Sequence, residues 1–453
     1  MKLGVVILAA GQGTRMKSSL PKVLHSLAEK PLLGHVIDTA RETGAARIAV
    51  VYGHGGEQVP DSFSAPDLVW VKQAEQLGTG HAVEQALPAM ETMDRVLILY
   101  GDVPLIGIAT LQALLEAGKE SPLALLTVTL DDPTGYGRIV RGDSANIRRI
   151  VEQKDASEEE LALCEINTGI MLVDGSKLRS WIARLESNNA QGEFYLTDIV
   201  AMAVAEGSKV RSAQPADAFE VVGVNDKVQL AQLERHLQQT RSEALMRNGV
   251  TLRDPSRFDL RGTLVVGRDV ELDINVLIAG NVVLGDNVKV GANTVIRNSK
   301  IGNGVQVFEN CVIENAVVGD GSRIGPFARL RPDAELSANV HVGNFVEIKK
   351  TRVDEGSKIN HLSYIGDCTI GKAVNVGAGT ITCNYDGVNK YRTVIEDKAF
   401  IGSDTQLVAP VKVGAGATVG AGSTITKDVP SDSLALSRTK QIGRVGWKRP
   451  QKK

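Results

Sequence analysis

The sequence predicts two domains: an α/β domain with a largely parallel sheet, followed by a parallel β-helix of six-residue repeats. Three observations point to this organisation. The chain has 453 residues, which is too long for one ordinary core. In the first half, short apolar runs alternate with helical patterns. In the second half, an aliphatic residue recurs at every sixth position and is often followed by glycine.

The composition narrows the class of protein. A hydrophobic fraction of 43% and a charged fraction of 23% are typical of a soluble globular chain. The formal net charge of −2 gives no global attraction to nucleic acid or to an anionic membrane. No apolar run approaches the ~20 residues that span a bilayer. We therefore expect a soluble, cytoplasmic protein with no nucleic-acid partner and no membrane insertion.

The cysteines indicate a reducing compartment. They are widely separated and form no CxxC pair, so they favour neither a zinc site nor a disulfide framework. They are Cys164, Cys311, Cys368 and Cys383. The N-terminal stretch MKLGVVILAAG mimics a short signal peptide, but it runs directly into the polar, cationic GQGTRMK. A buried parallel strand explains this stretch better.

The first half contains the elements of an α/β domain. The runs GVVILAA, RIAVVYG, RVLILYG and LALLTVTL predict strands, and residues 36–43 and 81–90 predict amphipathic helices between them. A helix at 225–248, followed by Gly249 as its cap, predicts a connector. The expected parts are residues 1–225 for the first domain, 226–250 for the connector helix, 251–437 for the β-helix and 438–453 for a basic tail.

The six-residue period is most regular near the end of the chain. Five aliphatic residues follow one another at this spacing: Ile401, Leu407, Val413, Val419 and Ile425. The period breaks between Val376 and Ile401, which are 25 residues apart, and between Ile348 and Ile359, which are 11 apart. Insertions in a solenoid leave the coil as loops, and such loops often form a binding face. Both breaks lie close to His361.

The segment LAAGQGTRMKSSLPKVL predicts a phosphate-binding turn. A buried strand ends there, and Gly11 and Gly13 let the backbone approach a ligand closely. Arg15 and Lys22 add two positive charges. The segment is not a P-loop, because GxxxxGK[ST] is absent, and Met16 replaces the third glycine of a Rossmann fingerprint.

Two further segments complete this predicted site. Residues 73–81 follow a short strand at 68–71 and offer an amide and a glycine-lined backbone to the edge of a base. Asp102 ends the RVLILYG strand, where a carboxylate can hold Mg²⁺ against phosphates. An isolated Asp is more often a turn residue, but its place at a strand end opposite the glycine turn favours the metal. Asn225 is equally suited to bind metal and to cap the connector helix.

From its first strand to its tail, the chain resembles the bacterial bifunctional UDP-N-acetylglucosamine pyrophosphorylase/glucosamine-1-phosphate acetyltransferase family. The motifs that carry the resemblance are GxGTRM…PK, QAEQLGTGHA, YGDVPL, DDPTGYGRIV, EINTGI, NNAQGEFYLTD, GVND, KINHLSYIGD and GAGTITCNYDGVNK. The resemblance implies a Rossmann-like nucleotidyltransferase domain with a mixed, mostly parallel sheet. It also implies left-handed winding of the β-helix and a homotrimer.

For the first domain, the resemblance implies uridylyl transfer from UTP to N-acetylglucosamine 1-phosphate, with Arg15 and Lys22 as catalytic residues and Mg²⁺ held by Asp102 and Asn225. The implied binding residues are Gln73, Gly78 and Thr79 for uracil, Gly137, Glu152 and Asn167 for the amino sugar, and Leu8, Ala9, Gly11, Gly13, Lys22, Tyr100 and Asn225 for the rest of the ligand. The side chain of Gln12 is expected to matter little.

For the second domain, the resemblance implies acetylation of glucosamine 1-phosphate by acetyl-CoA, with His361 as general base. The implied contacts are Arg331, Lys349, Tyr364, Asn375 and Lys390 for the sugar phosphate, and Ala378, Asn384, Tyr385, Ser403, Ala421 and Arg438 for acetyl-CoA or the developing oxyanion. A coil that serves only as a scaffold has no need for the basic residues in this set.

Three functional hypotheses remain at this point. The leading one is an enzyme that acetylates glucosamine 1-phosphate and then makes UDP-N-acetylglucosamine for cell-envelope sugars. The second is a sugar-1-phosphate nucleotidyltransferase whose β-helix serves only assembly. The third is a β-helix that binds a protein partner, which predicts no dependence on acetyl-CoA. The expected partners of the leading hypothesis are the two sugar phosphates, UTP and acetyl-CoA.

Overall fold

The computed structural model describes residues 1–53, 55–142 and 146–451. The chain divides into two compact units, residues 1–237 and 238–453, and the division falls within helix α8 (Lys227–Arg247). Among the described residues, no helix is both long enough and apolar enough to cross a bilayer.

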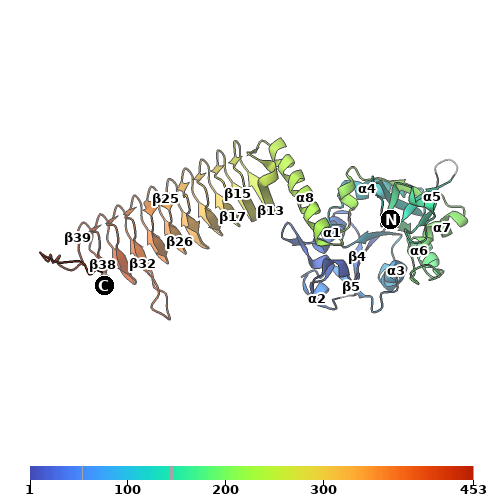
Figure 1. Ribbon diagram of the computed structural model, residues 1–453, viewed down its shortest axis with the longest axis horizontal. Coiled ribbons are helices and arrows are strands. Elements are labelled where there is room, and N and C mark those ends of the chain that lie inside the picture. Colours follow the sequence, from blue (N-terminus) through green and yellow to red (C-terminus); the bar gives the residue numbers. More distant parts are fainter. Residues whose placement is uncertain (54, 143–145, 452–453) are drawn as a thin grey trace. The chain divides into compact units, whose positions relative to one another are not determined.

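The first unit is built on a mixed, mostly parallel sheet in the order β11-β7-β10-β6-β1-β4-β5 (Figure 1). Strand β10 runs antiparallel to its neighbours β6 and β7, and the other pairs along this path are parallel. The strands are β1 (Leu3–Ala9), β4 (Arg47–Tyr52), β5 (Leu68–Lys72), β6 (Arg95–Tyr100), β7 (Leu123–Thr129), β10 (Glu165–Asp174) and β11 (Arg211–Ala213), with the hairpin β8 (Arg138–Arg141) and β9 (Ile147–Val151) attached to β10. The four apolar runs are therefore strands, as predicted.

Helices cover both faces of this sheet. They are α1 (Leu32–Glu42), the single turn α2 (Gln58–Asp61) and α4 (Ile108–Ala117) on one face, and α3 (Thr79–Ala86), α6 (Gly175–Ile182) and α7 (Asp198–Ala205) on the other. The single turn α5 (Glu158–Leu161) has no buried residue. Successive residues of a strand point to opposite faces. Val5 and Ile7 accordingly pack in one core, and Val6 and Leu8 in the other. This two-sided burial explains why the strands are continuously apolar.

The predicted helices differ from the structure at their ends. Helix α1 begins at Leu32, four residues before the predicted start. The predicted helix 81–90 is instead α3, which starts at Thr79, followed by a 3₁₀ turn at Leu87–Met90 that contains a proline near its start. Proline has no N–H to donate, which accounts for the change of helix type.

The second unit is a left-handed parallel β-helix (Figure 1). One face is a sheet of β12 (Thr251–Leu252), β14 (Glu271–Leu272), β16 (Lys289–Val290), β19 (Gln306–Val307), β22 (Arg323–Ile324), β25 (His341–Asn344), β28 (Lys358–His361), β31 (Asn375–Val376), β34 (Phe400–Ile401), β37 (Thr418–Val419) and β39 (Leu434–Ala435). The other two faces are β13 (Phe258–Val266), β15 (Val276–Leu284), β17 (Val295–Arg297), β18 (Lys300–Ile301), β20 (Val312–Glu314), β21 (Val317–Val318), β23 (Arg329–Leu330), β24 (Ala334–Leu336), β26 (Glu347–Lys349), β27 (Thr351–Val353), β29 (Tyr364–Gly366), β30 (Cys368–Ile370), β32 (Ile381–Cys383), β33 (Thr393–Ile395), β35 (Gln406–Val408), β36 (Val411–Val413) and β38 (Thr424–Ile425).

The aliphatic residues of the hexapeptide pattern fill the inside of the coils, as predicted. Ile401, Leu407, Val413 and Val419 are fully buried, and Ile425 is 5% exposed. Each such side chain contributes about 1.5–3 kcal/mol when it leaves water. The β-helix therefore has one continuous aliphatic core along its length.

Of the two breaks in the period, only the first is an insertion. Val376 and Ile401 still pair across adjacent coils, and between them the segment that joins β32 to β33 leaves the coil as a loop (Figure 1). The expectation of a loop between Ile348 and Ile359 is wrong. There the coil turns one residue early, at Lys350, whose φ of 46° lies in the left-handed region. The same early corner occurs at Asn315, so it is a regular part of this solenoid.

Candidate active sites

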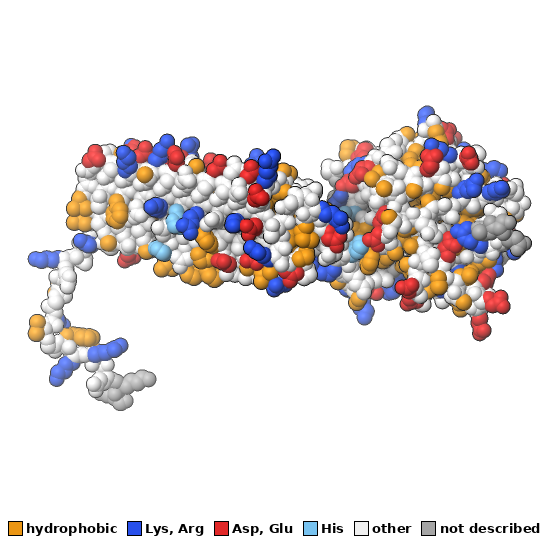
Figure 2. Space-filling view, turned by 90° about the horizontal axis from the view of Figure 1, so that it is seen from above, with side chains coloured by type: hydrophobic (Ala, Val, Ile, Leu, Met, Phe, Trp, Pro, Cys, Tyr) orange, Lys and Arg blue, Asp and Glu red, His pale blue; other side chains and the backbone are white. Residues whose placement is uncertain are grey.

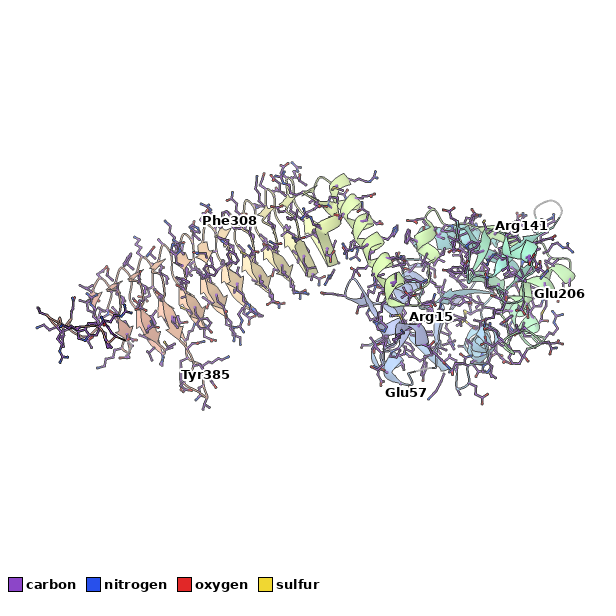
Figure 3. The ribbon with its side chains drawn as sticks, in the orientation of Figure 1. Arg15, Glu57, Arg141, Glu206, Phe308 and Tyr385 are labelled. Carbon is purple, nitrogen blue, oxygen red and sulfur yellow. The ribbon has the colours of Figure 1, made fainter. Side chains whose placement is uncertain are left out.

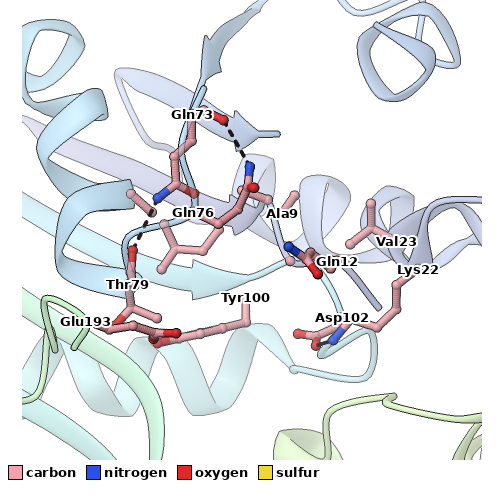
Figure 4. Close-up of a pocket in the computed structure, with 15 residues that line it drawn as sticks. Ala9, Gln12, Lys22, Val23, Gln73, Gln76, Thr79, Tyr100, Asp102 and Glu193 are labelled. Atoms are coloured by element: carbon pink, nitrogen blue, oxygen red, sulfur yellow. Dashed lines mark hydrogen bonds and ion pairs between the residues drawn. The ribbon is translucent and has the colours of Figure 1, made fainter. Parts of the chain in front are cut away.

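The first unit contains a cavity of about 460 Å³ at the carboxyl ends of β1, β5 and β6 (Figure 4). This is the edge where parallel sheets bind ligands. The predicted residues that line it are Leu8, Ala9, Gly11, Lys22, Gln73, Gly78, Thr79, Tyr100 and Asp102. The structure therefore brings nine of the predicted residues, from four separate segments of the chain, into one cavity.

The glycine turn after β1 has a specific geometric role. Gly13 has a φ of 62°, and a Cβ there would lie 2.7 Å from Cβ of Lys22. A larger residue at this position would displace Lys22. Gly11 has open space around its Cα and faces the cavity. The turn thus presents bare backbone to a ligand and holds Lys22 beside it.

Two cations meet two oxygen-bearing side chains next to this turn. The Nζ atom of Lys22 forms an ion pair with the carboxylate of Asp102, whose side chain is only 17% exposed. Nη2 of Arg15 (labelled in Figure 3) donates to Oδ1 of Asn225 over 2.9 Å, and Nζ of Lys22 lies 3.5 Å from the same oxygen. These four side chains form a single polar cluster. Of the four, Lys22 and Asp102 line the cavity.

The alternative role of Asn225 as a helix cap is wrong. The first free N–H groups of α8, those of Val228 and Gln229, donate to Oδ1 of Asp226 over 2.9 and 2.8 Å. Asp226 is therefore the capping residue. The amide oxygen of Asn225 is left to face the two cations.

The polar cluster fits a magnesium ion. The carboxylate of Asp102 and the amide oxygen of Asn225 are ligands of the kind that Mg²⁺ prefers, and both already hold cationic groups. No group of three or more His, Cys, Asp or Glu side chains that could hold a metal occurs in the part of the chain that the structure describes. Phosphate oxygens of a substrate would have to supply further ligands.

The wall formed by residues 73–80 depends on glycine. Gly78 has a φ of 108°, and a Cβ there would lie 2.7 Å from the carbonyl oxygen of Phe194. The hydroxyl of Thr79 accepts a hydrogen bond from the N–H of Leu196 over 3.1 Å. This wall is consequently held against residues 193–196, and it presents Gln73, whose side chain is buried, to the cavity.

The predicted sugar residues form a cluster beside Tyr100. The N–H of Asn167 donates to the carbonyl of Gly137 over 2.8 Å, and a Cβ on Gly137 would lie 3.3 Å from the carboxylate of Glu152. Burial raises the pKa of Glu152 and that of Tyr100, although Thr197 donates to Glu152 over 3.2 Å. Gly137, Glu152 and Asn167 thus come together, but outside the set of residues that line the cavity.

Sequence reasoning missed several residues of this cavity. They are Ala10, Gln12, Val23, Gln76, Ala82 and Glu193. Gln12 was expected to matter little, yet its side chain lies in the lining (Figure 4). Gln76 belongs to the same motif as Gln73, and this proximity was the one signal that could have identified it.

In the second unit, His361 lies at the end of β28 with an exposed imidazole. Its Nδ1 lies 2.7 Å from Oδ1 of Asn344, which occupies the equivalent position 17 residues earlier, in β25 of the preceding coil. An amide oxygen only accepts, so the hydrogen of the neutral ring lies on Nδ1. The lone pair of Nε2, which makes no hydrogen bond with the described residues, is free to accept a proton.

Three of the predicted phosphate ligands form a cationic cluster. The ammonium of Lys390 lowers the pKa of Lys349, and the nearby guanidinium of Arg331 adds to this effect. Arg331 is itself held by Glu347, whose Oε1 accepts from its Nη1 over 2.7 Å. Figure 2 shows histidine side chains beside Lys and Arg side chains on one face of the β-helix. Like charges that converge in this way are stabilised by a bound anion.

The other predicted sugar residues differ in their placement. Tyr364 folds over Gly366, where a Cβ would lie 2.4 Å from the tyrosine hydroxyl and 3.0 Å from Nδ2 of Asn384. Asn384 is buried and donates to the carboxylate of Asp367. Asn375 lies in β31, which pairs with β28, the strand that ends at His361. Tyr385 is 59% exposed on the protruding loop (Figure 3).

The predicted acetyl-CoA residues follow one corner of successive coils. The carbonyl of His361 accepts from the N–H of Gly379 over 3.2 Å, and that of Ala378 accepts from the N–H of Asp404 over 2.7 Å. One coil further, the carbonyl of Ser403 accepts from the N–H of Gly422 over 2.8 Å. In the following coil, Nη1 of Arg438 donates to the carbonyl of Ala421 over 2.9 Å. His361 therefore shares one edge of the β-helix with four of the predicted coenzyme contacts, Ala378, Ser403, Ala421 and Arg438. Asn384 and Tyr385, at the start of the protruding loop, are not part of this series.

Comparison with known proteins agrees with this division into two sites. Residues 5–191 match the MobA-like NTP transferase domain, residues 260–334 match the GMPPB C-terminal domain, and residues 392–427 match six repeats of the bacterial transferase hexapeptide. The chain is also similar along its whole length to proteins named "Bifunctional protein GlmU". It is 58% identical over 448 residues to that of Azoarcus sp. (strain BH72), covering 99% of both chains. It is 58% identical over 453 residues to that of Stutzerimonas stutzeri (strain A1501), covering 100% of both.

A third relative, from Nitrosospira multiformis, is 56% identical over 453 residues, which are 100% of this chain and 98% of that protein. This similarity extends through both units. The chain therefore belongs to the GlmU family of bifunctional enzymes, with an N-acetylglucosamine-1-phosphate uridylyltransferase in its first half and a glucosamine-1-phosphate N-acetyltransferase in its second.

Proposed function

We propose that the cavity of the first unit binds UTP and N-acetylglucosamine 1-phosphate, with the base on the wall of Gln73, Gly78 and Thr79. The cluster of Arg15, Lys22, Asp102 and Asn225 is the single observation that carries this assignment. A phosphate oxygen of the sugar attacks the α-phosphorus of UTP, and pyrophosphate leaves. This displacement needs alignment and charge neutralisation more than a protein base.

Within this site, Asp102 and Asn225 would hold Mg²⁺, which supplies charge neutralisation at the phosphates. The side chains of Arg15 and Lys22 supply further positive charge at the phosphates. Gly137, Glu152 and Asn167 would hold the amino sugar beside Tyr100. The burial that raises the pKa of Glu152 places its carboxyl group where a hydrogen bond from a sugar hydroxyl is strong.

In the second unit, we infer that the cationic cluster binds the phosphate of glucosamine 1-phosphate, with Tyr364 and Asn375 as further contacts of the sugar. The observation that carries this inference is the convergence of Lys349, Lys390 and Arg331. The C2 amine attacks the thioester carbonyl of acetyl-CoA, Nε2 of His361 takes the proton, and the CoA thiolate leaves. The edge that runs from Ala378 to Arg438 would hold the coenzyme.

Removal of divalent metal separates the two proposed sites. With excess EDTA, we expect release of pyrophosphate from UTP and N-acetylglucosamine 1-phosphate to stop. Release of free CoA from acetyl-CoA and glucosamine 1-phosphate should continue, because in the second site Lys349, Lys390 and Arg331 neutralise the phosphate in place of a metal ion. Both products can be followed in parallel samples of the same protein. Loss of both activities, or of neither, would contradict the assignment of the metal to the first site.

We also propose an oligomeric state and a cellular compartment for this enzyme. Hexapeptide β-helices are suited to self-association, and we propose a homotrimer packed through this unit, with sites completed by neighbouring subunits. The four cysteines form no disulfide. Together with the nucleotide and coenzyme substrates, this supports a cytoplasmic enzyme that supplies UDP-N-acetylglucosamine for peptidoglycan and lipopolysaccharide.

A further inference from the structure

The side-chain amide of Gln73 is held on one side by two contacts. Its Nε2 lies 3.2 Å from the carbonyl oxygen of Gly78 and 3.1 Å from Nδ1 of His81. Gln73 is 3% exposed and lines the cavity of the first unit. His81 belongs to α3 and is not itself part of the lining.

The contact with Gly78 settles which end of the amide is the nitrogen. A backbone carbonyl oxygen only accepts hydrogen bonds, so the atom of Gln73 that faces it must be the NH₂ group. One hydrogen of this group goes to Gly78. The other is directed at Nδ1 of His81, which must therefore present a lone pair.

This contact also fixes the tautomer of the imidazole. With a lone pair on Nδ1, the neutral ring carries its hydrogen on Nε2. The structure places Nε2 of Gln85 3.1 Å from Nε2 of His81. Two donors cannot bond to each other, so this amide is turned by 180° and its carbonyl oxygen accepts from the ring. Gln85, His81 and Gln73 form a chain of hydrogen bonds in which each group has one orientation.

The orientation of Gln73 determines what it offers to a ligand. Both hydrogens of its NH₂ group are used by Gly78 and His81, and no described residue donates to its carbonyl oxygen. Figure 4 shows the nitrogen directed at residues 78–79 and the oxygen on the other branch of the amide. The cavity is therefore offered a hydrogen-bond acceptor. Uracil carries a hydrogen on N3 and can donate to it, whereas N3 of cytosine carries a lone pair and cannot.

We propose that His81 is a specificity-determining residue, which selects uracil over cytosine by holding the carbonyl oxygen of Gln73 toward the base. The proposal rests on the proposed position of the base against Gln73. His81 acts through Gln73 and is a positioning residue. Without its acceptor, only the carbonyl of Gly78 still holds the NH₂ group. Turning this group toward N3 of cytosine then costs one hydrogen bond less.

The test compares His81→Leu with His81→Asn in the full-length protein. The two side chains have similar size and shape, but only asparagine offers an acceptor near the position of Nδ1. For each variant, kcat/KM is measured with UTP and with CTP in the presence of N-acetylglucosamine 1-phosphate and Mg²⁺. A buried donor or acceptor left unpaired changes an equilibrium by about tenfold or more. We expect H81L to reduce the preference for UTP over CTP by at least about tenfold, and H81N to keep most of it.

A purely structural role would give a different result. If H81L lowers kcat/KM for UTP and CTP by the same factor, or leaves both unchanged, the role of His81 in base selection is wrong. Gln73→Leu separates this failure from that of the underlying site. Loss of the preference in Q73L but not in H81L rejects the inference alone. A preference that survives in Q73L shows that the base does not bind at Gln73.

Discussion

Replacing His361 by alanine is expected to lower the rate of acetyl transfer by about 10²- to 10⁴-fold, which is the usual contribution of a general base. The geometry supports this because Asn344 holds Nδ1 and leaves Nε2 as the proton acceptor. The measurement is release of free CoA from acetyl-CoA and glucosamine 1-phosphate, with thiol detection. The rate of the variant should show no recovery at higher acetyl-CoA concentration, since proton transfer rather than binding is lost.

The same variant contains its own control. Uridylyl transfer from UTP to added N-acetylglucosamine 1-phosphate uses only residues of the first unit, so release of pyrophosphate by H361A should equal that of the wild type. If H361A releases CoA at the wild-type rate, His361 is not the base. That result would favour the alternative hypothesis, in which the β-helix serves only assembly.

Replacing Asp102 by asparagine is expected to reduce uridylyl transfer and to leave acetyl transfer unchanged, which is the reverse of the result expected for H361A. The variant keeps the shape of the side chain but removes the negative charge that would hold Mg²⁺ and that now pairs with Lys22. Metal stabilisation of phosphoryl charge amounts to several kcal/mol, so uridylyl transfer should fall by about 100-fold or more. Release of pyrophosphate measures this, and release of CoA should be unchanged.

A matched control for this variant is Asp94→Asn. Asp94 is an exposed aspartate of the same unit, which accepts from the N–H of Lys2 over 2.6 Å and does not line the cavity. Its replacement should leave both activities within about twofold of the wild type, because surface polar contacts contribute little. Activity of D102N close to that of D94N would contradict the role of Asp102 as a metal ligand.

The sequence was sufficient for the fold because its signals are local and repeated. Val5 to Leu8 are apolar without interruption, which only a strand buried on both faces explains. Ile401 and the aliphatic residues that follow it at intervals of six identify the β-helix in the same way. The spacing of Ile348 and Ile359 was misread, because an early corner of a coil and a loop that leaves it both shift the period by one residue.

The sites were only partly predictable because they depend on contacts between distant segments. The sequence alone could not pair His361 with Asn344, since their contact follows from the register of neighbouring coils. It left the role of Asn225 open, and only the geometry of Asp226 as the cap resolved it. It gave no reason to place Glu193 in the cavity, because Glu193 reaches the lining only through the packing of residues 193–194 against Gly78.

The central claim, two reactions in sequence on one chain, is tested most directly by a single incubation. The purified protein is given glucosamine 1-phosphate, acetyl-CoA, UTP and Mg²⁺, and free CoA and pyrophosphate are followed together. We expect both to appear, and we expect pyrophosphate to be lost when acetyl-CoA is left out, because the unacetylated sugar is not the acceptor of the second reaction. Release of pyrophosphate from N-acetylglucosamine 1-phosphate without any release of CoA from glucosamine 1-phosphate would contradict the claim.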